Sequence, residues 1–186
     1  MHVGIVQSLG EFVRSCCSAE AKAAYARLVP AGEVMAFREI PDVRVQSLVA
    51  ALAGAEGKTS AELLADYGRH WVKGARTAYP TPFAARDTKA FLQGFGGTHL
   101  AARALPGSQP PEIEVIDRGP GRLALRYRSS RHMCGLIRGI VEGVAAVYGE
   151  RAAIAEPECL LAGGTCCTFE VELRPSPAPA ASGRVP

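Results

Sequence analysis

The stretch from residue 113 to residue 147, IEVIDRGPGRLALRYRSSRHMCGLIRGIVEGVAAV, decides the fold, because the spacing of its apolar residues changes partway along it. Up to Tyr127, apolar and polar residues alternate on both sides of a Gly-Pro-Gly turn at 119–121. That period and that turn chemistry are typical of a β-hairpin. From Met133 to Val147, apolar residues recur every three or four positions, which predicts a long amphipathic helix.

Helical spacing fills the chain before this stretch, and strand spacing follows it. The expected helices are residues 1–14, 19–28, 43–53, 59–75 and 91–100. Ser18 is expected to cap the second of them, and Thr59 and Ser60 open the fourth with Glu62 as the cap partner. The further strands are 152–156 and 167–173, joined across Gly163-Gly164. We therefore expect an α+β fold, in which an N-terminal helical subdomain precedes a long helix packed on a small antiparallel sheet of about four strands.

Length and charge narrow the class of protein. A chain of 186 residues suits one domain, assigned here to residues 1–174, and the Pro-, Ala- and Ser-rich residues 175–186 are expected to be a disordered tail. A net charge of +3 without a basic stripe argues against a nucleic-acid partner. No apolar run of membrane-spanning length and no signal peptide is found, so we expect a cytoplasmic protein whose six cysteines are thiols or metal ligands.

Three hydrogen-bond donors stand at alternate positions from the end of the hairpin onward, namely Tyr127, Ser129 and Arg131. In an extended strand these side chains point to one face. A phenol, a hydroxyl and a guanidinium on one face suit a carboxylate ligand. The alternative is a polar strand face that is simply solvated.

His99 lies in an apolar, glycine-rich helical stretch, where Gly96 and Gly97 leave room for a flat ligand. A neutral imidazole is a good ligand for iron, although a lone histidine can equally be a structural residue bonded to a neighbour. A histidine ligand together with donors for two propionates is the equipment of a haem pocket, with the haem lying between the helical part and the sheet.

The order of these motifs resembles the haem nitric oxide/oxygen-binding (H-NOX) family. His99 is followed by the pair Pro110-Pro111 and then by Tyr-x-Ser-x-Arg at 127–131. The resemblance extends over about residues 1–173 and includes the segment Tyr67-Gly68-Arg69.

The resemblance implies a role for each matching residue. His99 would be the proximal ligand to the iron of haem b, and Tyr127, Ser129 and Arg131 would bind the haem propionates. Pro111 would press on the macrocycle and distort it.

The resemblance also implies which gas is sensed. Oxygen-binding members of the family have a tyrosine nine residues after the motif tyrosine, where this chain has Leu136. The other positions expected on the distal side are Ile5, Leu9, Trp71, Ala75 and Ile140. Only Trp71 carries a polar group, and its indole N–H leaves a hydrogen bond to the ligand open. We expect nitric oxide to be bound and oxygen rejected, with carbon monoxide as an experimental surrogate.

The expected output is a signal rather than a reaction, since no catalytic motif is found. By the resemblance, nitric oxide would weaken the bond between iron and His99, relax the haem and move the helix that bears His99. The signal would pass to a separate protein, a histidine kinase or a cyclic-di-nucleotide enzyme.

Four cysteines in the last third of the chain are candidate zinc ligands, namely Cys134, Cys159, Cys166 and Cys167. Cys166 is the weakest of them because neighbours on a strand face opposite ways, and His132 or Glu156 could substitute. Several bacterial H-NOX proteins carry a structural zinc in this region. The alternative is a set of small buried thiols, and Cys16 and Cys17 receive no role.

Two other functions stay open. The same fold could serve as a haem-free module that binds another small molecule and is held together by zinc. It could also be a thiol-based redox sensor in which the cysteines, and not His99, respond.

Overall fold

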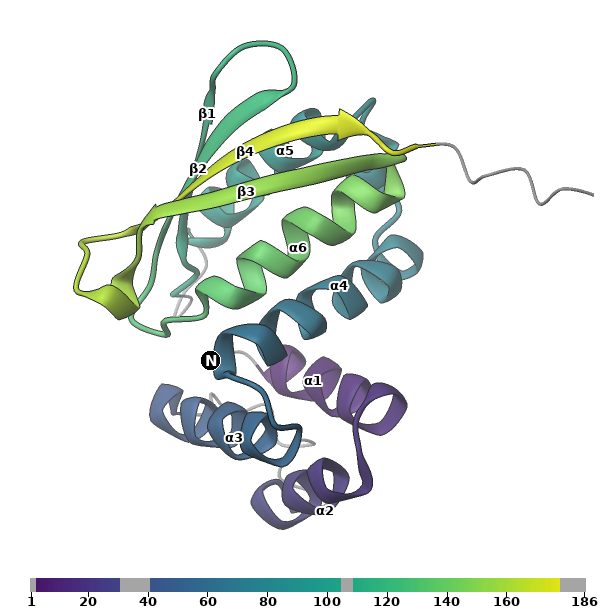
Figure 1. Ribbon diagram of the computed structural model, residues 1–186, viewed down its shortest axis with the longest axis vertical. Coiled ribbons are helices and arrows are strands. Elements are labelled where there is room, and N and C mark those ends of the chain that lie inside the picture. The colour runs from purple at the N-terminus through teal and green to yellow at the C-terminus, as the bar shows by residue number, and fades with distance from the viewer. Residues whose placement is uncertain (1–2, 31–40, 105–108, 178–186) are drawn as a thin grey trace, which may run out of the picture.

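The computed structural model describes residues 3–30, 41–104 and 109–177, with side chains of the first helix described from Val6 onward. Its α+β architecture confirms the predicted fold class (Figure 1). The helices are α1 (Val3–Cys16), α2 (Ala19–Leu28), α3 (Asp42–Ala55), α4 (Ser60–Ala78), η2 (Thr81–Ala84), α5 (Thr88–Ala102), α6 (Cys134–Val147) and η3 (Leu160–Ala162). The strands are β1 (Glu112–Asp117), β2 (Arg122–Arg128), β3 (Glu150–Glu158) and β4 (Cys167–Pro175).

Local hydrogen bonds fix where several helices begin. The Thr59 side chain accepts from the Glu62 backbone N–H, and the Glu62 carboxylate accepts from the Thr59 N–H, so the expected capping box is present. Ser18 caps α2 as predicted. Asp87, which the sequence analysis did not single out, caps α5 by accepting from the Ala90 N–H at 2.7 Å.

The four strands form one antiparallel sheet in the order β1-β2-β4-β3. The last strand in the chain therefore lies inside the sheet, with Tyr127 of β2 opposite Cys167 of β4 and Ile154 of β3 opposite Val171. Helices α5 and α6 cover one face (Figure 1). The other face carries charged pairs such as Arg126 with Glu114, as a solvated sheet face requires.

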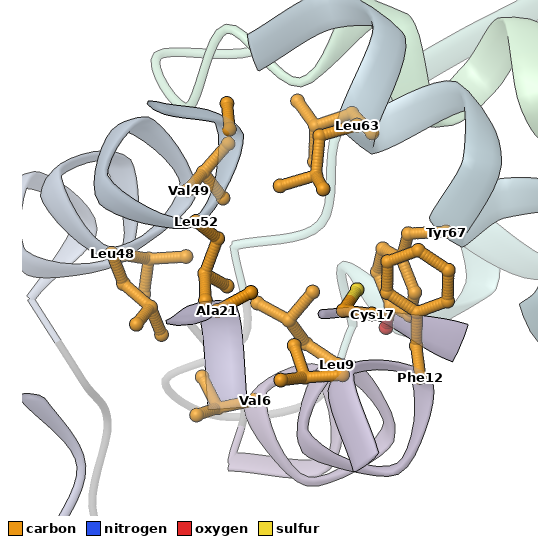
Figure 2. Close-up of a cluster of buried hydrophobic side chains, with 14 of the residues drawn as sticks. Val6, Leu9, Phe12, Cys17, Ala21, Leu48, Val49, Leu52, Leu63 and Tyr67 are labelled. Carbon is orange, nitrogen blue, oxygen red and sulfur yellow. The ribbon is translucent and has the colours of Figure 1, made fainter. Parts of the chain in front are cut away.

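Two separate clusters of buried side chains hold the fold together. One joins α1, α2, α3 and the first half of α4, and Figure 2 shows Leu9, Leu52 and Tyr67 in it. The other joins α5, α6 and the inner face of the sheet. Trp71 and Leu136 are only partly buried and pack against both clusters, so they mark the boundary between the two halves.

Helices α4 and α6 approach each other closely along a row of glycines. A Cβ on Gly135 or Gly139 would collide with the backbone of α4, at Ala61 and Ala65 respectively. On the facing helix, a Cβ on Gly68 would lie 2.6 Å from the Leu136 carbonyl oxygen. The spacing of the glycines on α6 is visible in the sequence.

Strand β4 continues to Pro175, one residue into the segment assigned to the tail. Residues 176 and 177 of that segment are described, and residues 178–186 lie outside the described part of the chain. None of the described helices is long and apolar enough to cross a membrane.

Candidate functional site

A cavity of about 150 Å³ lies where the two halves of the molecule meet, between α4, α5, α6 and the segment that follows β2. Its lining residues are Tyr67, Trp71, Phe95, His99, Pro111, Tyr127, Ser129, Arg131, Met133, Leu136, Ile137 and Ile140. The structure thus brings together the predicted iron ligand, the predicted propionate donors, the predicted distorting proline and three of the predicted distal residues.

One hydrogen bond orients the His99 ring within α5. Its Nδ1–H donates to the carbonyl oxygen of Phe95, one turn earlier, at 3.0 Å, which leaves Nε2 without a proton. The Phe95 ring packs edge-on against the imidazole at 4.4 Å between centroids. Burial lowers the pKa of His99, although the bond to Phe95 opposes this, so the neutral form that binds metals is favoured.

The predicted donor trio converges on the cavity, but not in the way the alternation implied. Only Tyr127 lies on β2, which ends at Arg128. The chain then turns, with the Arg131 N–H donating to the Ser129 hydroxyl at 3.2 Å and His132 adopting a positive φ of 54°. The expectation of one extended strand through Arg131 was therefore wrong, because these local bonds fold the segment back.

The three donors already have partners within the protein. The Tyr127 phenol oxygen accepts from the Met133 N–H at 3.3 Å, and the phenol is also hydrogen-bonded to the Ser129 side chain. The Arg131 Nε donates to Asp42 of α3 at 3.0 Å, and Nη1 donates to the Gln109 carbonyl oxygen. A guanidinium has five N–H groups, so others remain.

The Asp42–Arg131 ion pair links the helical half to the cavity. Burial opposes ionisation of Asp42, but the hydrogen bond and charge of Arg131 outweigh it, so the pKa of Asp42 lies below its usual value. Asp42 therefore stays a carboxylate, and it already occupies the position of a counter-ion to Arg131.

The predicted distal residues are not all brought together. Trp71, Leu136 and Ile140 line the cavity. Leu9 instead packs inside the helical cluster (Figure 2), and Ala75 is buried outside the lining. The side chain of Ile5 lies outside the described part of the structure.

Sequence reasoning missed Tyr67 as a lining residue. It lies one helical turn before Trp71 on α4, and that i, i+4 spacing was a signal that could have found it. Its hydroxyl is hydrogen-bonded to the Ser8 hydroxyl of α1. Burial raises the pKa of Tyr67 to about 12, so the phenol keeps its proton.

The chemistry of the lining fits haem: a neutral imidazole with a free nitrogen, three donors for carboxylates, and apolar walls between them. The volume is small, since ordinary ligand pockets measure about 300–1,000 Å³. The helices around the cavity would have to separate to admit a macrocycle.

A second cluster lies next to the start of α6. One ligand atom from each of Cys134, Glu156, Cys159 and Cys167 falls within 4.8 Å of all the others. The sulfur of Cys159 lies 3.8 Å from the sulfurs of both Cys134 and Cys167. Among the described residues, the buried carboxylate atom Glu156 Oε1 has no hydrogen-bond partner, whereas Oε2 accepts from Arg138 at 3.4 Å.

Without a metal ion, the thiols of this cluster keep their protons. Burial, reinforced by the neighbouring Cys159, raises the pKa of Cys134 to about 11, and burial raises that of Cys167 too. A divalent ion reverses this balance by stabilising thiolates. Three thiols and one carboxylate form a donor set that is compatible with a zinc ion.

Cys166 is not part of this cluster. Its sulfur donates to Glu158 Oε2 at 3.2 Å, away from Cys167, because adjacent residues along the chain at the start of β4 point apart. His132 is exposed and is also outside the cluster. Of the two substitutes that the sequence offered, the structure brings only Glu156 to the thiols.

Comparisons with known proteins agree with the fold and the family. The model of the haem-NO-binding (HNOB) family matches residues 4–156. No curated protein sequence matches the chain.

Among solved structures, a variant of the T. tengcongensis H-NOX protein superposes with a TM-score of 0.81 and 20% identity, over 95% of this chain and 99% of that one. An H-NOX protein from S. oneidensis in the Fe(II)NO ligation state gives 0.80 and 19%, over 94% and 99%. An unliganded Fe(II) H-NOX variant from K. algicida gives 0.78 and 17%, over 94% and 97%.

Proposed function

The chain belongs to the haem-NO-binding family, whose members are haem-based gas-sensing domains, and from this premise we propose that it senses nitric oxide through a haem held by His99. The observation that carries the proposal is the convergence of His99 with Tyr127, Ser129 and Arg131 on one cavity. Bound haem would supply the ferrous iron to which a diatomic gas attaches.

On the proximal side, His99 would bind iron through Nε2. The bond from Nδ1–H to the Phe95 carbonyl supports this role because it fixes both the tautomer and the direction of the ring. Pro111, which also lines the cavity, would press on the macrocycle.

On the propionate side, Tyr127, Ser129 and Arg131 would donate to the two carboxylates. Arg131 would then stand between a propionate and Asp42, so the charge of the haem edge and the orientation of α3 become linked. Asp42 was not among the residues expected from the sequence.

On the distal side, the described lining favours nitric oxide over oxygen. Bound oxygen is stabilised by a nearby hydrogen-bond donor, whereas nitric oxide needs none. Leu136 and Ile140 provide none, and the Tyr67 hydroxyl is held by Ser8. Among the predicted distal residues that line the cavity, Trp71 alone carries a donor, its indole N–H.

The signal would leave through α5. If nitric oxide weakens the bond between iron and His99, α5 is released to move against β1, on which it packs at Gly96 beside the Ile113 carbonyl. A separate protein, a histidine kinase or a cyclic-di-nucleotide enzyme, would read that shift. In this proposal the domain is not itself an enzyme.

Absorption spectroscopy of the purified, haem-loaded protein tests the proposal. We expect a Soret band that shifts when nitric oxide or carbon monoxide is added to the reduced protein and that shows no stable change in air. His99→Gly should lose the band and regain it with free imidazole. His70→Ala, which changes a histidine outside the cavity, should behave as wild type. A stable spectral change in air would contradict the gas assignment, and a folded, colourless wild type would favour the haem-free module.

We also propose a structural zinc held by Cys134, Glu156, Cys159 and Cys167. Such a site would tie the start of α6 to β3 and β4, and its support is the 4.8 Å cluster with the orphaned Glu156 oxygen. Elemental analysis should give one zinc per chain, and Glu156→Gln should lower the affinity for zinc. Cys166→Ser should keep full zinc content, and loss of zinc there would refute the ligand set.

A further inference from the structure

Two adjacent cysteines at the end of α1 lie in very different surroundings. Cys16 is exposed and Cys17 is buried, and among the six cysteines, all of which the structure describes, Cys16 is the one exposed thiol. Burial, with help from Glu56, raises the pKa of Cys17 to about 11, so that thiol stays protonated and inert. Neither belongs to the haem cavity or to the thiol cluster beside α6.

The exposed thiol is paired with a base from another helix. The sulfur of Cys16 lies 3.4 Å from Nδ1 of His70 on α4, within hydrogen-bond distance for sulfur. The Phe12 ring packs against the imidazole at 5.5 Å between centroids, which holds the ring towards α1. An imidazole beside a thiol can take its proton and leave the nucleophilic thiolate.

The pair opens into a groove of about 620 Å³ between α1, α4 and α6. Two of its cations are already neutralised, since Lys58 pairs with Asp66 at 2.8 Å and Arg69 pairs with Asp66 and Glu142. Lys73 and Arg76 are exposed on the same groove and form no ion pair within the described residues. They could therefore meet the carboxylates of an incoming small molecule.

We propose that Cys16 is a redox-modification site, at which the Cys16–His70 pair exchanges with low-molecular-weight disulfides that carry carboxylates, such as glutathione disulfide. The thiol proton passes to His70 Nδ1, and the Cys16 sulfur attacks one sulfur of the disulfide. A new sulfur–sulfur bond forms and the old one breaks. The departing thiolate takes up the proton, so Cys16 is oxidised and the small disulfide is reduced to one thiol. This site is independent of haem.

The test is to incubate the haem- and zinc-loaded protein with glutathione disulfide and to follow the adduct by intact mass and peptide mapping. We expect a single mixed disulfide on Cys16, absent in Cys16→Ser and unchanged in Cys17→Ser. His70→Asn keeps a polar side chain there without the base, and should slow the reaction about fivefold. It should do so with glutathione disulfide and with the uncharged hydroxyethyl disulfide alike.

The charges of the groove are tested separately. Lys73→Glu combined with Arg76→Glu should slow the reaction with glutathione disulfide but not with hydroxyethyl disulfide. The matched pair Lys22→Glu and Arg27→Glu reverses two exposed charges on α2 outside the groove and should change neither rate. An adduct on a different cysteine, or a His70→Asn rate equal to wild type, would overturn the proposal. Neither result depends on whether nitric oxide is the sensed gas.

Discussion

The protonation of His99 depends on its helix and on its burial together. The Phe95 carbonyl is available because the two residues lie one turn apart on α5, and the surrounding apolar side chains disfavour the charged ring. Any histidine in a helix could bond to the carbonyl oxygen of the residue four positions earlier. The lowered pKa of His99 comes instead from burial in the cavity. The histidine could therefore be predicted from the sequence, and its neutral form could not.

At the same scale, Leu136 is expected to control gas selectivity. Leu136→Tyr places a phenol donor on the cavity wall, and the reduced, haem-loaded variant should then form a stable complex in air. Leu136→Phe is the matched control, since it adds similar bulk without the hydroxyl and should still reject oxygen. Absorption spectra in air compare the two, and equal spectra would show that this position does not face the gas.

The carboxylate of Asp66 is expected to make stability depend on pH. Burial opposes its ionisation, but hydrogen bonds from Lys58 and Arg69 outweigh this, so its pKa lies below the usual value. A carboxyl with a lower pKa in the folded state stabilises the fold above its unfolded pKa of about 3.9, and that contribution is lost as the pH falls below it.

Urea unfolding measures this effect. Asp66→Asn should lower the free energy of unfolding by about 1 kcal/mol at neutral pH, a small value because the partners are partly exposed. The difference should shrink as the pH falls through the lowered folded-state pKa of Asp66, because the carboxyl is then protonated in both states. Glu11→Gln, at an exposed position on α1, is the control and should be neutral throughout. A difference that persists at low pH would mean that the charge is not its cause.

Among the elements, α4 and α6 are held at close range by small residues. The glycines of α6 let its backbone approach Ala61 and Ala65, and this contact positions Trp71 and Leu136 on opposite helices of the same cavity. A wider separation of α4 and α6 would move Trp71 and Leu136 apart.

Gly139→Ala is therefore expected to be costly. Its Cβ would collide with the Ala65 carbonyl group, and overpacking of this kind costs about 3 kcal/mol when the backbone must shift. Gly74→Ala, on α4 where nothing lies within 4 Å, should instead stabilise by about 0.5–1 kcal/mol. Chemical denaturation measures both, and a neutral Gly139→Ala would show that the helices can separate freely.

In the whole molecule, two hydrophobic clusters meet at the cavity. Trp71 and Leu136 pack against both clusters and are only partly buried. Helix α4 is tied to α6 by the glycine contacts, so α1, α2 and α3 are expected to open separately from the sheet half when haem is absent. A haem held by His99 on one side and packed against Trp71 on the other would couple them.

Hydrogen exchange followed by mass spectrometry tests this coupling. In the haem-free protein, amides of α1, α2 and α3 should exchange faster than those of α6 and the sheet, and haem loading should slow them. In the variant His99→Gly the added haem should protect them less. Uniform exchange across both halves before loading would contradict the division into two units.

The sequence by itself determined the features that depend on residues close together in the chain. Apolar spacing, the Ser18 cap, the Thr59–Glu62 capping box and the turn at 119–121 placed the elements and the α+β class. The motif order from His99 to Arg131 identified the residues that the structure gathers around one cavity.

Only the tertiary structure decided what lies beside what. It set β4 between β2 and β3, turned the chain after Arg128, moved Leu9 into the helical core and brought Tyr67 to the cavity. It also brought Glu156, and not Cys166, to the three thiols. The physical reason is that caps and periodicity act within one helix or strand. These contacts depend instead on how helices and strands that are distant in sequence pack together, and no local sequence pattern predicts that packing.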